Sequence, residues 1–232
     1  MTYSESTLTA EELTIGKEGA QLFRAVLSRT QLSELESAFG TQPRDQAGVR
    51  LSGIPELRPL LSAAGPVGKI PASALGPDCL PVRAILFDKN VDRNWSLGWH
   101  QDRTIAVRHR IDVDGFGPWS VKSGMVHVEP PFDLLASMVT ARVHLDAVPE
   151  TNAPLLVAPG SHKRGRIPTS EIPEVVRQCG IVTCLAAAGD IWLYATPILH
   201  ASDAASQPLH RRVLQIDYAV GQLPGGLEWL GV

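Results

Sequence analysis

Long runs of one residue type are missing from this chain. No run of Lys or Arg exceeds two, and 21 basic against 24 acidic residues leave a formal charge of −3. Binding to a phosphate backbone needs clustered positive charge, so no nucleic-acid partner is expected. The longest uncharged apolar stretches, such as residues 180–189, are shorter than the roughly 20 residues that cross a membrane, so no membrane association is expected. The opening MTYSESTLTAEEL is polar and acidic, unlike a signal or transit peptide.

Cysteine is scarce as well. Cys79, Cys179 and Cys184 are odd in number and lack the paired spacing of a metal finger. Their pattern argues against a disulfide scaffold and favours a reducing compartment. We therefore expect a cytoplasmic protein whose cysteines only pack.

Glycine and proline are abundant, at 20 and 18 residues, while charged residues make up only 19%. This composition favours many short strands joined by tight turns over a helical bundle. The length of 232 residues suits one domain with its own core. We expect a single domain over 1–232, with a flexible tail at 1–16 and a barrel core at 80–220.

Helical patterns precede strand patterns along the chain. Two short helices are predicted within 16–40, the second opened by a capping box at Ser28 and Gln31, and another helix over 54–64. Strands are predicted later, with two short helices among them. The predicted strands are 82–87, 139–145, 155–157, 181–187, 190–194, 197–200 and 211–219, and the helices are 132–138 and 170–178. This order indicates a mainly β barrel or sandwich with N-terminal helices packed on one face.

A candidate metal site begins in the string WHQD. His100 and Asp102 are two residues apart, so they share one face if the chain is extended there. His200, on a later predicted strand, could complete a set of two histidines and one carboxylate. Non-haem Fe(II) oxygenases use that set with open coordination positions. His144 and Asp146 have the same spacing, so spacing alone leaves this second pair open.

Arg211 follows His200 by eleven residues, with a turn predicted between them. Arginine binds a carboxylate through two charged hydrogen bonds, which suits a dicarboxylate cosubstrate. Arg212 is the alternative. The even-numbered positions of 212–218 are the more apolar, so we expect them to pack against the helices and Arg211 to face the cavity.

Other ionisable residues receive a more ordinary interpretation. Arg83 and Lys89 are expected as solvated charges at strand ends, with a contact to an anionic substrate or cosubstrate as the alternative. His127 lacks a partner at ligand spacing and is expected at the surface or beside the site rather than in it.

As an ordered set, these motifs resemble the phytanoyl-CoA dioxygenase family of Fe(II)- and 2-oxoglutarate-dependent oxygenases. The matching stretches are LFDKNVDRNWSLGWHQDRTIAV (86–107), HVEPPFDLLASMVTARVHLD (127–146), NAPLLVAPGSHKRG (152–165) and GDIWLYATPILHASDAASQPLHRRVLQIDYA (189–219). The chain has Ala153 where the family often has glycine, a departure expected to affect a turn and not the site.

The resemblance implies a double-stranded β-helix, that is, a jelly-roll or cupin-like barrel. It implies that His100, Asp102 and His200 bind Fe(II), and that His144 and Asp146 do not. It also implies 2-oxoglutarate as cosubstrate, bound by Arg211 with Ser202 as a further contact, and O2 as oxidant.

The resulting hypothesis is a 2-oxoglutarate-dependent dioxygenase. It would hydroxylate an unactivated C–H bond of a small molecule and release succinate and CO2. One alternative is a cupin-like metalloenzyme that does not use 2-oxoglutarate, and another is a non-catalytic barrel acting as a binding module. The identity of the substrate and the oligomeric state stay open at this point.

Overall fold

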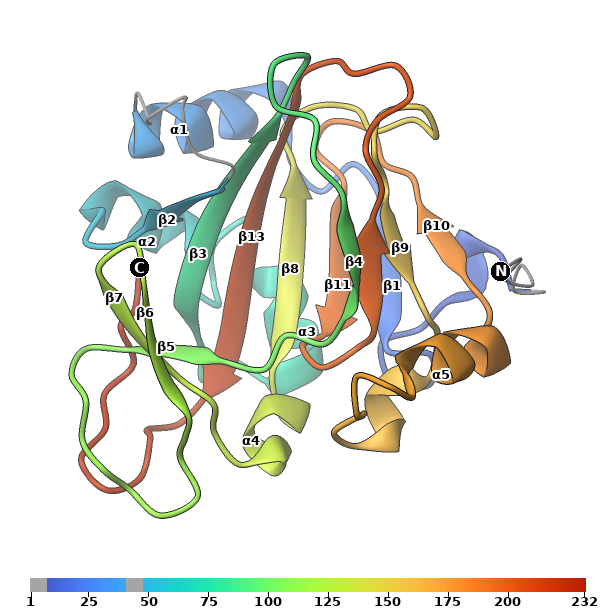
Figure 1. Ribbon diagram of the computed structural model, residues 1–232. Helices are drawn as coiled ribbons and strands as arrows, with labels where there is room; N and C mark the ends of the chain where they lie inside the picture. Colours follow the sequence, from blue (N-terminus) through green and yellow to red (C-terminus); the bar gives the residue numbers. More distant parts are fainter. Residues whose placement is uncertain (1–7, 41–47) are drawn as a thin grey trace.

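Two facing β-sheets form the centre of the protein. The computed structural model describes residues 8–40 and 48–232. In spatial order, the strands of the large sheet are β1 (Ala20–Phe23), β11 (Ile191–Ala195), β8 (Val139–His144), β13 (Arg211–Val220), β3 (Cys79–Lys89) and β2 (Gly48–Leu51). Those of the small sheet are β10 (Val182–Cys184), β9 (Leu155–Val157), β12 (His200–Ser202) and β4 (Leu97–His100). Figure 1 shows the small sheet in front of the large one, the jelly-roll arrangement predicted from the sequence.

A third sheet and several short helices surround this centre (Figure 1). The third sheet consists of β5 (Ile105–Val107), β7 (Met125–Val128) and β6 (Trp119–Lys122). The α-helices are α1 (Arg29–Phe39), α2 (Arg58–Leu61), α3 (Lys69–Leu75), α4 (Phe132–Ala136) and α5 (Ile172–Cys179). Single 3₁₀ turns are η1 (Ala10–Glu12), η2 (Pro55–Leu57) and η3 (Ser161–Arg164). Within the described ranges, no helix is long and apolar enough to cross a bilayer.

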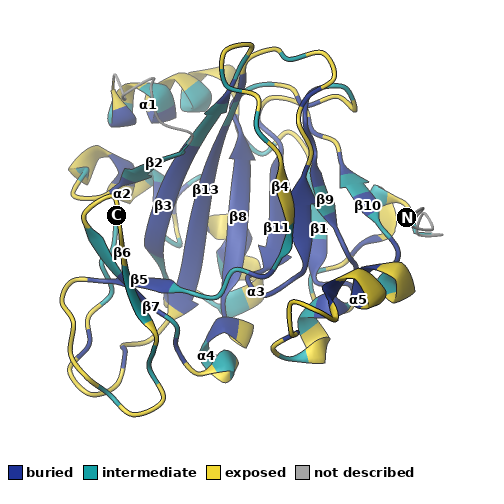
Figure 2. Cartoon of the chain, in the orientation of Figure 1, coloured by how far each residue is buried: buried dark blue, intermediate teal, exposed yellow. Residues whose placement is uncertain are grey.

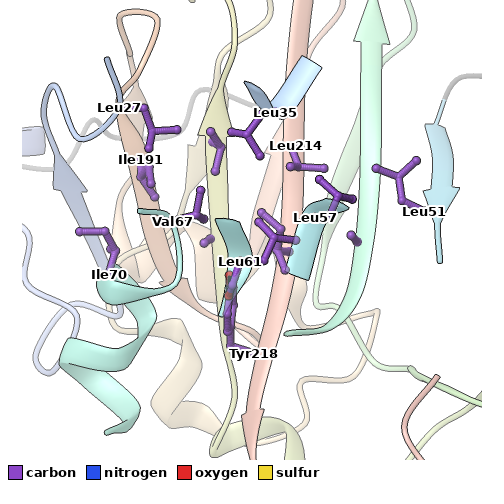
Figure 3. Packing of buried hydrophobic residues seen from close by; sticks show 14 of the residues in the cluster. Leu27, Leu35, Leu51, Leu57, Leu61, Val67, Ile70, Ile191, Leu214 and Tyr218 are labelled. Atoms are coloured by element: carbon purple, nitrogen blue, oxygen red, sulfur yellow. Dashed lines mark hydrogen bonds between the residues drawn. The ribbon is translucent and has the colours of Figure 1, made fainter. Parts of the chain in front are cut away.

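Helices α1, α2 and α3 cover one face of the large sheet. Figure 3 shows the apolar core between them, in which Leu35, Leu61 and Ile70 pack with Leu214 and Tyr218 of β13. The Tyr218 hydroxyl donates to the carbonyl oxygen of Leu61 at 2.9 Å. Figure 2 shows the four inner strands of the large sheet, β11, β8, β13 and β3, buried along most of their length. The predicted packing of N-terminal helices on one face is confirmed.

The prediction of the first of two helices within 16–40 is wrong. That segment forms β1, which pairs antiparallel with β11 at the edge of the large sheet. Gly19 and Ala25 flank the strand with φ angles of 80° and 49°. A right-handed helix requires negative φ throughout, so the backbone at both ends of this segment excludes one.

The segment expected as a tail is partly attached to the core. Residues 1–7 lie outside the described residues. From Leu8 onward the chain packs beside the small sheet, and Leu13 is only 2% exposed, in a cluster with Val157 and Trp192. Burial of an apolar side chain against both sheets stabilises this attachment.

The second predicted helix is confirmed as α1. The contribution of its capping box to stability can be tested by mutation. Ser28 Oγ accepts a hydrogen bond from the Gln31 backbone N–H, and Gln31 Oε1 accepts one from the Ser28 N–H. We expect Ser28→Ala to lower the free energy of unfolding by about 1 kcal/mol. Ser37→Ala, at an exposed site inside the same helix, is the control and should cause no loss, because alanine favours the helix. Urea denaturation measures both, and equal stabilities would contradict the cap.

Candidate active site

A cavity of about 490 Å³ lies between the two sheets. Its walls come from β2, β3, β8 and β13 of the large sheet, from β4, β9 and β12 of the small sheet, and from the end of β6. This volume falls within the range of about 300–1,000 Å³ that is usual for small-molecule sites. All five predicted site residues line it: His100, Asp102, His200, Ser202 and Arg211.

Three potential metal ligands converge in this cavity. One ligand atom each of His100, Asp102 and His200 lies within 4.8 Å of the other two. The two histidines are directly paired across β4 and β12, with ring centroids 4.2 Å apart. Over residues 8–40 and 48–232, no other group of His, Cys, Asp and Glu is arranged in this way. The structure thus brings together the set of two histidines and one carboxylate that the spacing predicted.

The imidazoles are oriented for coordination through the same ring nitrogen. His100 Nδ1 lies 2.8 Å from the carbonyl oxygen of Gly98, and His200 Nδ1 lies 3.0 Å from that of Ile198. A carbonyl oxygen only accepts, so each Nδ1 carries the proton and each Nε2 keeps its lone pair. Such a backbone contact fixes both the tautomer and the ring orientation of a metal-binding histidine.

The protonation states of the three groups also suit a cation. Burial alone would raise the pKa of Asp102, but Arg83 and the two imidazoles lower it, and the net shift is downward. Burial and the neighbouring His100 lower the pKa of His200 to about 4. At neutral pH the site therefore presents a charged carboxylate beside neutral imidazole, the forms that a metal ion requires.

Arg83 connects this site to the interior of the large sheet. Its Nε donates to Asp217 Oδ2 at 2.6 Å, and its Nη2 lies 3.6 Å from Asp102 Oδ2. Thr140 Oγ1 donates to the other carboxylate oxygen of Asp217. Arg83 is buried, so the expectation of a solvated charge at a strand end is wrong. The reason is the register, which places Arg83 directly opposite Asp217 on the cavity face.

Arg211 and Arg212 point to opposite faces of β13. Arg212 binds Asp146 and Glu36, on the side of the helices. Arg211 is 2% exposed, and its buried Nε and Nη1 have no hydrogen-bond partner in the described part of the chain. Burial and the nearby Arg142 lower the pKa of Arg211 to about 9. The predicted orientation of the strand is confirmed, and it leaves a buried cation without an anion.

Lys89 lies beside Arg211, its cross-strand partner on β3. The ammonium donates to Ser202 Oγ at 3.1 Å and to the carbonyl oxygens of Trp95 and Asp203 at 2.7 and 3.1 Å. Burial, with Arg211 as the next cause, lowers the pKa of Lys89 to about 7. The expectation of a solvated Lys89 is therefore wrong: its three donors connect the large sheet to β12.

The turn at Ala153 also reaches the site. Ala153 has a φ of 53°, a left-handed conformation that glycine adopts without strain. Its carbonyl oxygen accepts a hydrogen bond from Ser202 Oγ at 3.1 Å. This contact uses a backbone carbonyl that glycine would also present, so the expectation that the departure leaves the site untouched stays a prediction.

The second histidine–aspartate pair does not form a site. His144 is 1% exposed, and neither ring nitrogen has a hydrogen-bond partner among the described residues. Burial lowers its pKa well below the usual value. Asp146 lies beyond the end of β8 and binds Arg212 instead. Neither residue lines the cavity.

Three charged residues of the cavity wall escaped the sequence analysis: Arg50, Lys122 and Arg142. Gln215 lines the cavity on the same face of β13 as Arg211, as the alternation predicted. Arg142 donates to Gln215 Oε1 at 2.9 Å, and Gln215 Nε2 donates to Asp102 Oδ2 at 3.4 Å. A signal for Arg142 existed, because polar and apolar residues alternate strictly along 139–144. In a strand covered by helices, the polar set faces away from them.

Solved structures of other proteins share this fold. EctD from S. alaskensis, crystallised with 2-oxoglutarate and 5-hydroxyectoine, superposes with a TM-score of 0.67 at 18% identity, over 99% of this chain and 83% of that one. SnoK, a non-haem α-ketoglutarate-dependent carbocyclase from nogalamycin biosynthesis, has a TM-score of 0.65 at 19% identity, over 98% and 90%. AviO1 from Streptomyces viridochromogenes Tue57 has a TM-score of 0.62 at 18% identity, over 90% and 93%. No curated protein matches the chain.

A jelly-roll that gathers two histidines and a carboxylate in its central cavity defines the class of non-haem iron oxygenases. The family model for phytanoyl-CoA dioxygenase (PhyH) matches residues 74–213, which contain all five predicted site residues. The chain belongs to this family of 2-oxoglutarate-dependent oxygenases.

His127, a buried histidine of β7, provides a test of the electrostatics of the interior. It is fully buried, with Nδ1 2.9 Å from the Met125 carbonyl oxygen. Burial lowers its pKa to about 4, and Arg83 and Lys122 contribute. In the unfolded chain the imidazole has a pKa of about 6.5. Between these values the unfolded protein binds one more proton, so acidification lowers the free energy of unfolding, by at most about 1.4 kcal/mol per pH unit.

We therefore expect His127→Gln to reduce this loss of stability between about pH 7 and pH 5. Urea denaturation of both proteins at the two pH values gives the difference. His109→Gln, at an exposed histidine, is the control and should keep the dependence of the wild type. Identical pH dependence in the His127 variant would contradict a buried, neutral imidazole.

Proposed function

We propose that the protein is an Fe(II)- and 2-oxoglutarate-dependent dioxygenase that hydroxylates an unactivated C–H bond of a small molecule and releases succinate and CO2. The observation that carries this proposal is the convergence of His100, Asp102 and His200 on a cavity whose Arg211 lacks an anion.

In this proposal His100, Asp102 and His200 are the catalytic metal ligands. The donor set fits Fe(II): two imidazole Nε2 atoms and one carboxylate, held in the required protonation states. Arg83 and Gln215 hold the Asp102 carboxylate from the large sheet. Three protein ligands leave coordination positions for small molecules.

Arg211 is the proposed anchor for 2-oxoglutarate. Its two unpartnered nitrogens suit a carboxylate that accepts two charged hydrogen bonds, and such an anion would offset the cost of burying the guanidinium. Ser202 is proposed as a further contact, because its hydroxyl lies in the same wall and is bonded to Lys89. Lys89, with its donors engaged, positions Ser202 rather than competing for the cosubstrate.

Each part of the cavity has a task in the reaction. When bound, iron and 2-oxoglutarate supply the activation of O2 that an attack on a C–H bond requires. The protein residues hold the ligands in place: the carbonyl oxygens of Gly98 and Ile198 orient the imidazoles, and Arg83 keeps Asp102 charged.

We propose hydroxylation as the outcome because one structural neighbour offers a direct parallel. EctD is seen with 5-hydroxyectoine, a hydroxylated small molecule. SnoK and the epimerase SnoN share the fold but are described with other outcomes, a carbocyclisation and an epimerisation. Neighbours of one fold thus differ in outcome, so we expect the outcome in this chain to depend on how the substrate is held.

The metal assignment can be tested against the excluded pair. Asp102→Asn removes a charged ligand and should weaken Fe(II) binding by at least about 100-fold, more than the loss of an outer partner causes. Asp146→Asn should keep the Fe(II) affinity of the wild type and lose about 1 kcal/mol of stability, because only its pairing with Arg212 is lost. Anaerobic Fe(II) titration by calorimetry measures both variants. Equal Fe(II) affinities would refute the assignment.

The neighbouring arginines provide a matched pair for the cosubstrate. Arg211→Gln should weaken 2-oxoglutarate binding to the Fe(II) protein by about 10–100-fold, the value of a charged hydrogen-bond pair. Arg212→Gln removes the same charge on the opposite face and should leave this affinity unchanged. A wild-type protein that binds Fe(II) but not 2-oxoglutarate would favour the cupin-like metalloenzyme, and one that binds neither would favour a binding module.

A further inference from the structure

The cavity wall carries far more positive charge than the proposed cosubstrate needs. Seven Lys and Arg side chains line the cavity, and Asp102 is the one carboxylate among the described lining residues. Fe(II) and the dianion 2-oxoglutarate cancel each other in charge. Arg211 is assigned to the cosubstrate, and Asp217 balances Arg83. Even when Asp102 is counted against one further cation, positive charge remains in excess after metal and cosubstrate are bound.

Arg50 is one of these cations. It lies on β2 opposite Ile85 of β3, and both side chains line the cavity. Arg50 Nη1 donates to Ser123 Oγ at 3.3 Å, while its buried Nε has no partner in the described part of the chain. Burial lowers the pKa of Arg50, and Arg83 adds to the effect. A guanidinium with a free buried donor is costly unless an acceptor arrives.

Lys122 approaches the same region from the end of β6. Its ammonium contacts Thr104 Oγ1 at 3.4 Å, two residues beyond Asp102 in the chain. Burial, then Arg83 and Arg50, lower the pKa of Lys122. Arg50 donates to Ser123, the residue that follows Lys122, and both cations line the cavity, so they face a common space. They come from β2 and from the β6–β7 hairpin, whereas Arg211 and Lys89 lie at the facing ends of β13 and β3.

We propose that Arg50 and Lys122 form a substrate subsite for an oxyanion, so that the molecule to be oxidised carries a carboxylate or a phosphate group. The inference rests on the proposed function, because it assigns Arg211 to the cosubstrate and the space beside Asp102 to the substrate. Arg50 is half-buried and Lys122 is exposed at the rim of the cavity. Together they recognise either anion through charge-assisted hydrogen bonds, and the anion offsets their mutual repulsion. The subsite selects acidic small molecules and fixes their orientation relative to the metal ligands.

The test measures anion binding to the anaerobic Fe(II) protein saturated with 2-oxoglutarate. The probes are butanoate with its neutral analogue butanamide, and sulfate, which represents a phosphate group, with neutral dimethyl sulfone. We expect the wild type to prefer at least one anion over its neutral analogue. Arg50→Gln and Lys122→Gln should each weaken the binding of that anion by about tenfold or more, which corresponds to the loss of one charged hydrogen bond. Preference for butanoate indicates a carboxylate substrate, and preference for sulfate a phosphate substrate.

Two controls separate the subsite from general charge and from folding. Arg58→Gln removes an exposed cation of helix α2 and should leave anion binding unchanged. Arg50→Lys keeps the charge and should restore part of the affinity lost in Arg50→Gln. In all four variants, 2-oxoglutarate affinity should stay within about twofold of the wild type, because no contact with the proposed cosubstrate anchor is removed.

Three results would overturn the subsite. They are equal binding of anion and neutral analogue by the wild type, unchanged anion affinity in both Gln variants, and a loss of 2-oxoglutarate affinity in those variants as large as the loss of anion affinity. The last result would assign these cations to the cosubstrate. A wild-type protein that fails to bind 2-oxoglutarate overturns the proposed function instead, and anion binding to the Fe(II) protein alone then still tests the two cations.

Discussion

The two-residue period of the strands in the large sheet controls both the core and the cavity. Along β13, Leu214 and Tyr218 point toward the helices, while Arg211 and Gln215 point into the cavity. A register shift of one residue would exchange the two sets, placing arginine under the helices and leucine in the cavity. The burial of apolar residues beneath α1, α2 and α3 therefore fixes the direction of the charged groups on the other face.

This arrangement places several charged side chains in the interior, and these side chains fall into two groups. Arg83 and Lys89 are fully engaged, by Asp217 and by oxygen atoms of the chain, and they hold β3 against β13 and β12. Arg211 and Arg50 keep buried donors without acceptors. Engaged cations stabilise the shape of the site, whereas cations with free donors reduce stability until an anion binds. The second kind is typical of ligand-binding surfaces.

Local signals in the sequence predicted much of the site. The spacing of His100 and Asp102 was sufficient to suggest a metal pair, and alternation along 211–219 was sufficient to orient Arg211. The same reasoning failed for Arg83 and Lys89, because a charge on a strand gives no indication of the residue opposite it. It also failed for β1, where a helical apolar pattern was overridden by pairing with β11. Arg50 and Lys122 lie in stretches without a motif, so only their position reveals them.

The sequence by itself determined what depends on neighbours along the chain: the capping box at Ser28, the β-rich class and the alternation of polar and apolar residues. The resemblance of its ordered motifs determined the family. Only the tertiary structure decided that His200 lies opposite His100, that Asp146 turns to Arg212, and that cations from distant strands share one cavity. The physical reason is that sheet partners here are far apart in sequence. Their register depends on hydrogen bonding and packing across the whole sheet, which no local pattern encodes.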